Sequence, residues 1–400
     1  MLGATGVLAV GGVAACADDS TSSSSDASAA STSSLPSNAA TGEAIKVGYI
    51  TPEGGAVSLA MVREGGEAAA NYLNNNGGGI GGHKIDLAVC KEQEEPASAT
   101  KCANEMVEKK VSVVVSPASS QGAVMVPIIT RAGIPYVSQA PVSQVEMVSP
   151  NSFMLSGGVI SVLSGQAVTA AKAGLKKVTV LVGDAGDAPA SIRALGTPIF
   201  KGAGVDLDVV SIPTSAADPT PQITAGLSGN PGAVSILGDQ RQCISVLKAL
   251  QTVAPQVKKY LISACLDKPV VAAVGAQTIA GAKAFTTVNT GSDDPSVTLY
   301  RSIMARYAPD TDPAGIAYLG YQTVMALGEV GKSLQNPVTA QSFITAFSGA
   351  KNVSLPAAPG IAFTCDSSAV PQLRALCSKA ILVSDVTSDS TLENTVAVNN

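Results

Sequence analysis

The cysteines are the residues with the most evident chemistry in this 400-residue chain, which has seven of them and a single histidine. Cys16 stands between an apolar stretch ending Val-Ala-Ala and a tail rich in serine, an arrangement typical of an exported protein's signal sequence. The other six are close in sequence two by two and could form disulfides, which persist only in an oxidising compartment. Sequence alone leaves several connectivities open, although closeness in the predicted elements favours one. That set pairs Cys90 with Cys102, Cys243 with Cys265, and Cys365 with Cys377.

Catalytic, metal and nucleotide chemistry find little support. Zinc would require CxxC-type spacings or several histidines, whereas His83 is the only histidine. The run NNNGGGIGGHK (74–84) follows a predicted helix and precedes a strand, the reverse of a dinucleotide loop, so we expect its glycines to form a helix C-cap and turn. A formal charge of −5 without a basic cluster argues against nucleic acid. We therefore expect no enzyme, no metal and no cofactor.

The first 43 residues are interpreted as a clipped signal peptide (1–16) and a disordered tether (17–43). The apolar part is too short to span a bilayer, and the tail has too little apolar surface to offset its ordering entropy. Val-Ala-Ala-Cys resembles the lipobox of bacterial lipoproteins, which implies that Cys16 carries a lipid and anchors the exported chain to the outer face of the cell membrane. A signal cysteine without a role is the alternative.

Strands and helices alternate from residue 45 onward, and the alternation restarts near residue 152. Strands are predicted at 45–50, 84–90, 111–116 and 134–138, with helices between them. This order is typical of parallel sheets with crossover helices. We expect an α/β fold of two doubly wound parallel-sheet lobes joined by a multi-strand hinge. Lobe 1 would contain 44–157 and 289–336, lobe 2 would contain 158–288 and 337–391, and 392–400 would be a tail.

Three stretches together resemble a known family: IKVGYI, NNNGGGIGGHKIDL, and EEPASATKCANEMVEKKVSVVVSPASSQGAVMVPIITRAGIPYVSQAP. Over residues 44–390 the chain resembles the extracytoplasmic solute-binding proteins of ABC transporters, in the branch of the leucine/isoleucine/valine-binding proteins. The resemblance implies the type I periplasmic binding fold, a monomer whose two lobes close on a small polar solute, and docking on an ABC transporter permease.

SPASSQGA (116–123) marks the end of a predicted strand and the start of a helix, where open α/β sheets bind ligands and where helix N-termini favour negative charge. The resemblance implies that Ser119 or Ser120 binds a solute carboxylate. It also implies a second contact at Ser138, beside Gln139. Read without the family, Ser119 is a helix N-cap, and the two roles can coexist.

In the second lobe, strand ends present Asp187 and Asp239 where amino-acid binders of the family usually carry tyrosine. Both aspartates could instead be loop-end or helix-capping acids. The acid that often holds a solute ammonium is replaced by Cys265, with Asp267 two residues later, while Tyr318 matches a helix that faces the cleft. We expect capture of an amino acid or a related amide or carboxylate. The alternative is a sensory or structural envelope lipoprotein of the same fold that recruits a partner.

Overall fold

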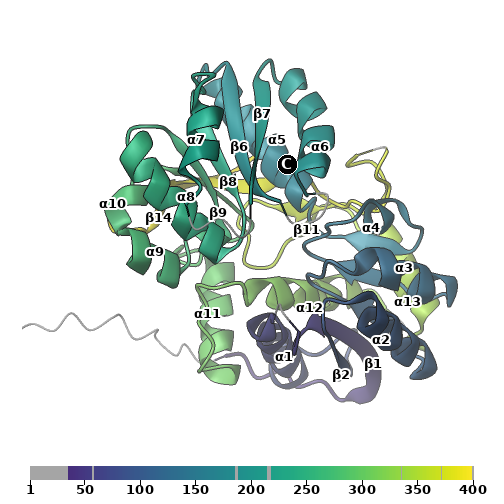
Figure 1. Cartoon of the computed structure of the whole chain (residues 1–400). Helices are drawn as coiled ribbons and strands as arrows, with labels where there is room; N and C mark the ends of the chain where they lie inside the picture. The colour runs from purple at the N-terminus through teal and green to yellow at the C-terminus, as the bar shows by residue number, and fades with distance from the viewer. Residues whose placement is uncertain are drawn as a thin grey trace, which may run out of the picture. The chain divides into compact units, whose positions relative to one another are not determined.

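The structure, a computed structural model, describes residues 35–55, 58–184, 188–213, 218–334, 336–370 and 372–398. The expected lipidation site Cys16, the signal segment, most of the tether and Asp187 lie outside the described residues. Two large sheets organise the rest, and we call the elements around them the first and the second lobe (Figure 1).

The first lobe is built on a five-stranded parallel sheet in the order β2-β1-β3-β4-β5. Its short central strand β3 is three buried valines, as expected for a parallel strand covered on both faces. Pro96 opens the helix after β2 at its first turn, where the missing N–H of proline costs no hydrogen bond. The strands are β1 (Gly42–Pro52), β2 (His83–Glu92), β3 (Val113–Val115), β4 (Tyr136–Ser138) and β5 (Ser152–Met154); the helices between them are α1 (Ala60–Asn75), α2 (Pro96–Glu108), α3 (Gly122–Arg131) and α4 (Gln144–Val148).

The second lobe is built on a seven-stranded sheet in the order β14-β13-β10-β9-β8-β6-β7. Its strands from β6 to β10 are parallel, and β13 and β14 add an antiparallel edge. The strands are β6 (Lys177–Gly183), β7 (Asp206–Ile212), β8 (Ala233–Leu237), β9 (Lys259–Ile262), β10 (Lys283–Thr286), β13 (Ile381–Val386) and β14 (Leu392–Val398). The helices are α5 (Val159–Lys172), α6 (Ala188–Gly202), α7 (Thr220–Leu227), α8 (Gln240–Val253), the short 3-10 helix η1 (Ser263–Cys265), α9 (Lys268–Val274) and α10 (Ala276–Ile279). The expected α/β fold with parallel sheets in two lobes is confirmed.

After β10 the chain returns to the first lobe. Two aromatic residues of α13, Phe343 and Phe347, lie in the same core cluster as Val47 of β1, and Phe347 stacks on Phe153 with ring centroids 5.0 Å apart. The segment from α13 to Cys377 therefore packs with the first lobe, although residues 337–391 were expected in the second. The remaining elements are α11 (Pro295–Tyr307), α12 (Tyr318–Gly331), α13 (Ala340–Ser348) and the antiparallel pair β11 (Val353–Ser354) and β12 (Ala362–Phe363).

Two glycines bring α1 and α12 into close contact and so fix the start of α12. A Cβ on Gly65 would lie 2.1 Å from the carbonyl oxygen of Ala317, and one on Gly320 would lie 1.9 Å from that of Val62. No side chain fits at such distances, so both positions require glycine. Tyr318, between these contacts, is held firmly in place.

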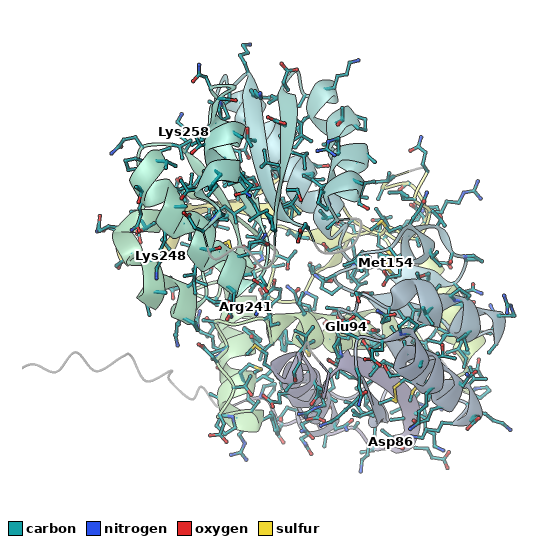
Figure 2. All side chains as sticks on the ribbon, in the orientation of Figure 1. Asp86, Glu94, Met154, Arg241, Lys248 and Lys258 are labelled. Atoms are coloured by element: carbon teal, nitrogen blue, oxygen red, sulfur yellow. A yellow bond between two sulfur atoms is a disulfide. The ribbon has the colours of Figure 1, made fainter. Side chains whose placement is uncertain are left out.

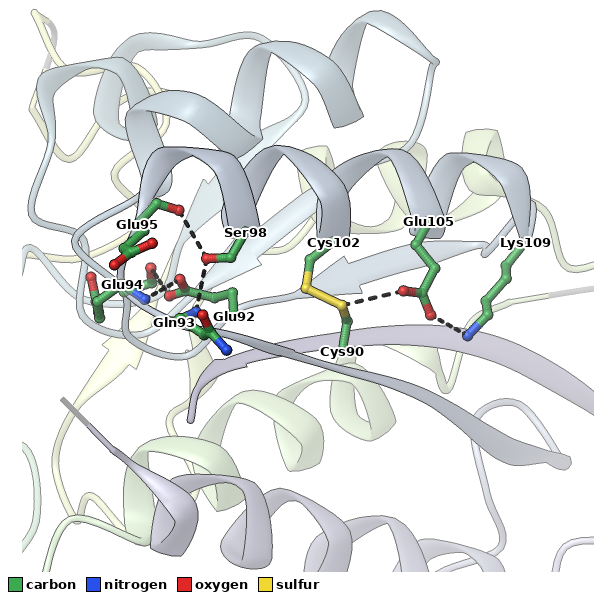
Figure 3. Close-up of a disulfide and its surroundings, with 10 residues drawn as sticks. Cys90, Glu92, Gln93, Glu94, Glu95, Ser98, Cys102, Glu105 and Lys109 are labelled. Atoms are coloured by element: carbon green, nitrogen blue, oxygen red, sulfur yellow. Dashed lines mark hydrogen bonds and ion pairs between the residues drawn. A yellow bond between two sulfur atoms is a disulfide. The ribbon is translucent and has the colours of Figure 1, made fainter. Parts of the chain in front are cut away.

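Three disulfides join neighbouring elements, and the favoured pairing is confirmed. The first ties β2 to α2 (Figure 3), the second ties α8 to η1, and the third ties two loops of the first lobe. In the described part of the chain no helix is long and apolar enough to span a bilayer. The bonded pairs are Cys90–Cys102, Cys243–Cys265 and Cys365–Cys377.

Candidate functional site

A cavity of about 320 Å³ lies where the carboxyl ends of strands from both sheets meet, and we call it the central cavity. Its volume is in the range of small-molecule sites, and its position is the one at which open α/β sheets bind ligands. Most of its lining is apolar, and none of the described residues that line it carries a charge. The first lobe contributes Gln139, Pro141 and Tyr318, among others, and the second contributes Leu237, Ser263 and Phe285.

Gln139, one of the residues that line this cavity, carries a buried acceptor without a partner. Its side chain is 1% exposed, and its Nε2 donates a hydrogen bond to Oε1 of Gln322 at 2.9 Å. Gln322 in turn donates from Nε2 to the carbonyl oxygens of Thr287 and Pro356, at 3.1 and 2.9 Å. These two bonds fix the orientation of the Gln322 amide, with its oxygen toward Gln139. The Gln139 amide must therefore direct its nitrogen toward that oxygen. Oε1 of Gln139 is left buried without a partner.

Two hydroxyl groups that line the same cavity join the two lobes. The oxygen atoms of Tyr318 and Ser263 are 3.3 Å apart, and both residues line the central cavity. Burial raises the pKa of Tyr318, against a smaller opposing effect of the bond to Ser263, so the phenol stays neutral at physiological pH. The pair can donate or accept a hydrogen bond, and it joins η1 to the start of α12.

The two serines of the predicted carboxylate site, Ser119 and Ser120, bind the protein's own glutamates. The hydroxyl of Ser119 donates to Oε1 of the buried Glu92 at 2.7 Å and accepts from the N–H of Gln121 at 3.0 Å. The N–H of Ser120 donates to both carboxylate oxygens of Glu94 at 3.1 Å, and its hydroxyl also donates to that carboxylate. Neither serine lines the central cavity.

Burial dominates the electrostatics of the two deepest acids of the first lobe. It raises the pKa of Glu92, while the hydrogen bonds from Ser119 and from the N–H of Glu94 act in the opposite direction. Burial likewise raises the pKa of Glu146, which completes a capping box with Ser143 at the start of α4. Figure 3 shows Glu92 at the end of β2 and Glu94 in the loop that follows.

The remaining predicted residues take structural positions where the structure describes them. Ser138 donates to the carbonyl oxygen of Pro117 at 3.4 Å, away from the cavity lining. Asp239 caps α8 by accepting from the N–H of Gln242 at 2.8 Å. Cys265 is bonded in a disulfide, and the carboxylate of Asp267 accepts from the amide of Gln240 at 2.6 Å.

The structure thus brings Gln139 and Tyr318, of the residues singled out from the sequence, to the central cavity. Ser263 and Gln322 were missed. Ser263 follows β9 directly, so its place at a strand's carboxyl end could have indicated it. Gln322 lies one turn beyond Tyr318 on α12, and only the folded core reveals its role. Within the described ranges no cluster of histidine, cysteine, aspartate or glutamate could hold a metal ion.

Comparisons with known proteins agree with this architecture. An ABC transporter substrate-binding protein from Sphaerobacter thermophilus superposes with a TM-score of 0.75 at 18% identity, covering 89% of this chain and 97% of that one. The leucine-binding protein LivK from Thermotoga maritima gives 0.69 at 17% identity, covering 88% and 98%. A solute-binding protein of an ABC transporter from R. palustris, solved with 4-hydroxybenzoate, gives 0.70 at 18% identity, covering 88% and 97%.

A comparison with curated proteins found no match. The periplasmic binding protein family model, in contrast, matches residues 44–377. Family and structural neighbours are substrate-binding proteins rather than enzymes, and the family implies a location outside the cytoplasm. The chain belongs to the periplasmic binding protein family.

Proposed function

We propose that the protein captures a small solute in the central cavity, outside the cytoplasm, and delivers it to an ABC transporter permease. The observation that carries this proposal is a cavity lined from both lobes, one of whose lining residues, Gln139, has a buried Oε1 without a partner. A buried acceptor without a donor costs free energy, and a bound solute that donates a hydrogen bond recovers it. Lipid on Cys16 would hold the protein at the membrane surface beside its permease.

Capture would work through closure of the lobes. A solute that contacts Gln139 in the first lobe and Leu237 or Phe285 in the second stabilises the closed arrangement, in which it can touch the two lobes at once. Ser263 and Tyr318 already join the lobes by one hydrogen bond, which favours the same arrangement. The permease would then recognise the closed form, a hinge motion of the type common among binding proteins.

The test is a calorimetric screen of the full-length protein against small solutes, repeated with Gln139→Met. Methionine keeps most of the side-chain volume but removes the acceptor, so we expect about tenfold weaker binding of the solutes found, equivalent to about 1.4 kcal/mol. Gln277→Met is the matched control, because Gln277 is exposed and lies outside the cavity. Equal affinity of the native protein and Gln139→Met would contradict the site.

Delivery and anchoring need separate measurements in cells. Loss of the protein should abolish uptake of the identified solute, and Cys16→Ala should move the protein from the membrane fraction to the soluble fraction. Uptake that continues unchanged without the protein would contradict the transport role and leave solute capture standing.

A further inference from the structure

The start of α3 is surrounded by the protein's own carboxylates. Helix N-termini attract anions through their free N–H groups and the helix dipole. Glu94 accepts from the N–H of Ser120 just before α3, and Glu92 accepts from Ser119. The carboxylate of Glu146 packs on the first residue of α3, because a Cβ on Gly122 would lie 2.1 Å from its Cδ. The carboxylate of Glu94 therefore binds the N–H of Ser120 directly before α3, and the carboxyl groups of Glu92 and Glu146 lie close to the same helix start.

Glu94 is held there by its backbone as well as by its side chain. Its N–H donates to Oε2 of Glu92 at 2.6 Å, and its carbonyl oxygen accepts from Nε2 of Gln121 at 3.2 Å. The residue has a φ of 57°, a left-handed conformation that costs energy for a side chain other than glycine. The contacts at both ends compensate this cost and aim the carboxylate at Ser120. Figure 2 labels Glu94 in the loop that follows β2.

The described lining of the central cavity offers no positive charge to a solute carboxylate. None of its described lining residues is charged, so a carboxylate entering it would lose water without gaining a cation. The carbonyl oxygen of Pro117, which accepts from the N–H groups of Gln139 and Ala140, ties the loop that precedes α3 to the cavity wall. A solute carboxylate that reached the start of α3 from the cavity would be repelled by the carboxylate of Glu94.

We propose that Glu94 occupies the anion-binding position at the start of α3 in place of a solute carboxylate, and that the central cavity takes an uncharged, largely apolar solute whose hydrogen-bond donor reaches Oε1 of Gln139. A primary amide, an alcohol or a phenol on an aliphatic or aromatic body has this chemistry. The inference about the solute rests on the proposed function. The inference about Glu94 does not, so the two can be tested separately.

The first experiment vacates the position and supplies a free carboxylate. Glu94→Ala should lower the thermal unfolding midpoint, and sodium acetate should restore part of the loss relative to sodium chloride at equal concentration. Neither the native protein nor Glu95→Ala should respond to acetate in this way, since Glu95 is exposed and has no side-chain bond at the start of α2. No acetate-specific stabilisation of Glu94→Ala would overturn the role of Glu94, while solute capture would be unaffected.

The second experiment uses solutes that differ only at one end: 4-methylpentanamide against 4-methylpentanoate, and 4-hydroxybenzamide against 4-hydroxybenzoate. Calorimetry on the native protein should show each amide binding at least tenfold more tightly than its carboxylate. Glu94→Ala should narrow this ratio, and Glu95→Ala should preserve it. A carboxylate that binds as tightly as its amide overturns the proposed solute class. Binding of neither member also counts against it, and if the wider screen still finds solutes, capture itself stands.

Discussion

The hydrogen bond between Ser119 and Glu92 gives the sharpest single prediction. Glu92 is fully buried, and its Oε1 accepts from the Ser119 hydroxyl at 2.7 Å. Ser119→Ala removes this donor, so that a buried carboxylate oxygen of Glu92 loses a hydrogen bond. Hydrogen bonds to charged groups contribute about 1.5–3 kcal/mol, so we expect the free energy of unfolding to fall by about 2 kcal/mol at pH 7.

The pH dependence distinguishes this cause from a general loss of packing. Burial raises the pKa of Glu92 and the bond from Ser119 opposes the rise, so removing the bond raises that pKa further. The free energy of unfolding that Ser119→Ala loses is therefore largest above the raised pKa. This loss shrinks as the pH falls and Glu92 takes up a proton in both proteins. Urea unfolding followed by circular dichroism at pH 7 and pH 4 measures both values.

Ser120→Ala is the matched control, because Ser120 also donates its hydroxyl to a glutamate but is exposed. Its effect should be less than half that of Ser119→Ala, since water replaces the lost donor. The reasoning is refuted if the two variants lose the same free energy at pH 7, or if the penalty of Ser119→Ala is undiminished at pH 4.

Two further substitutions test other acids. Asp239→Ala removes the N-cap of α8 and should lower the free energy of unfolding by about 1 kcal/mol without changing solute affinity; a loss of affinity in calorimetry would instead place Asp239 at the solute. Glu146→Gln tests a carboxyl group whose pKa is raised by burial. A group with a raised pKa stabilises the native state at low pH, and this contribution is lost as the pH rises. The thermal unfolding midpoint of Glu146→Gln should therefore rise relative to that of the native protein between pH 4 and pH 7. The opposite trend would contradict this reasoning.

Local patterns were sufficient to predict the sheets, because buried parallel strands read as short apolar runs such as the three valines of β3. They were insufficient for the C-terminal strand β14. Several of its seven residues are exposed and it pairs at the edge of the sheet, so 392–398 carries no strong apolar pattern and was expected to be a tail. Residues 340–377 were likewise assigned to the second lobe, because an amphipathic helix indicates that it has a buried face without indicating which sheet covers that face.

The site was predictable to the extent that strand ends determine position. Gln139 follows β4 and lies at the cavity as its place implies, and Tyr318 lies there as the family resemblance implies. The partners of Ser119 were not predictable in this way. Glu92 ends β2, Ser119 follows β3, and β1 lies between these strands in the sheet. Which side chains meet across a central strand depends on the folded register and the loop conformation, including the left-handed residue at Glu94.

An internal carboxylate at α3 changes where the binding energy of a solute must come from. A zwitterion held at a helix start gains charge-assisted hydrogen bonds, which are the strong ones. The described residues that line the central cavity offer apolar contact, the buried amide of Gln139 and neutral hydroxyl groups, among them those of Tyr318, Ser263 and Thr287. Each buried methylene then contributes about 0.8 kcal/mol, about fourfold in affinity, and loss of the donor to Gln139 costs about tenfold. The affinity for a solute should therefore depend more steeply on the size of its apolar body than on its charge. In a series of primary amides that differ by one methylene, affinity should rise about fourfold with each added methylene until the cavity is full, and the next methylene should lower it.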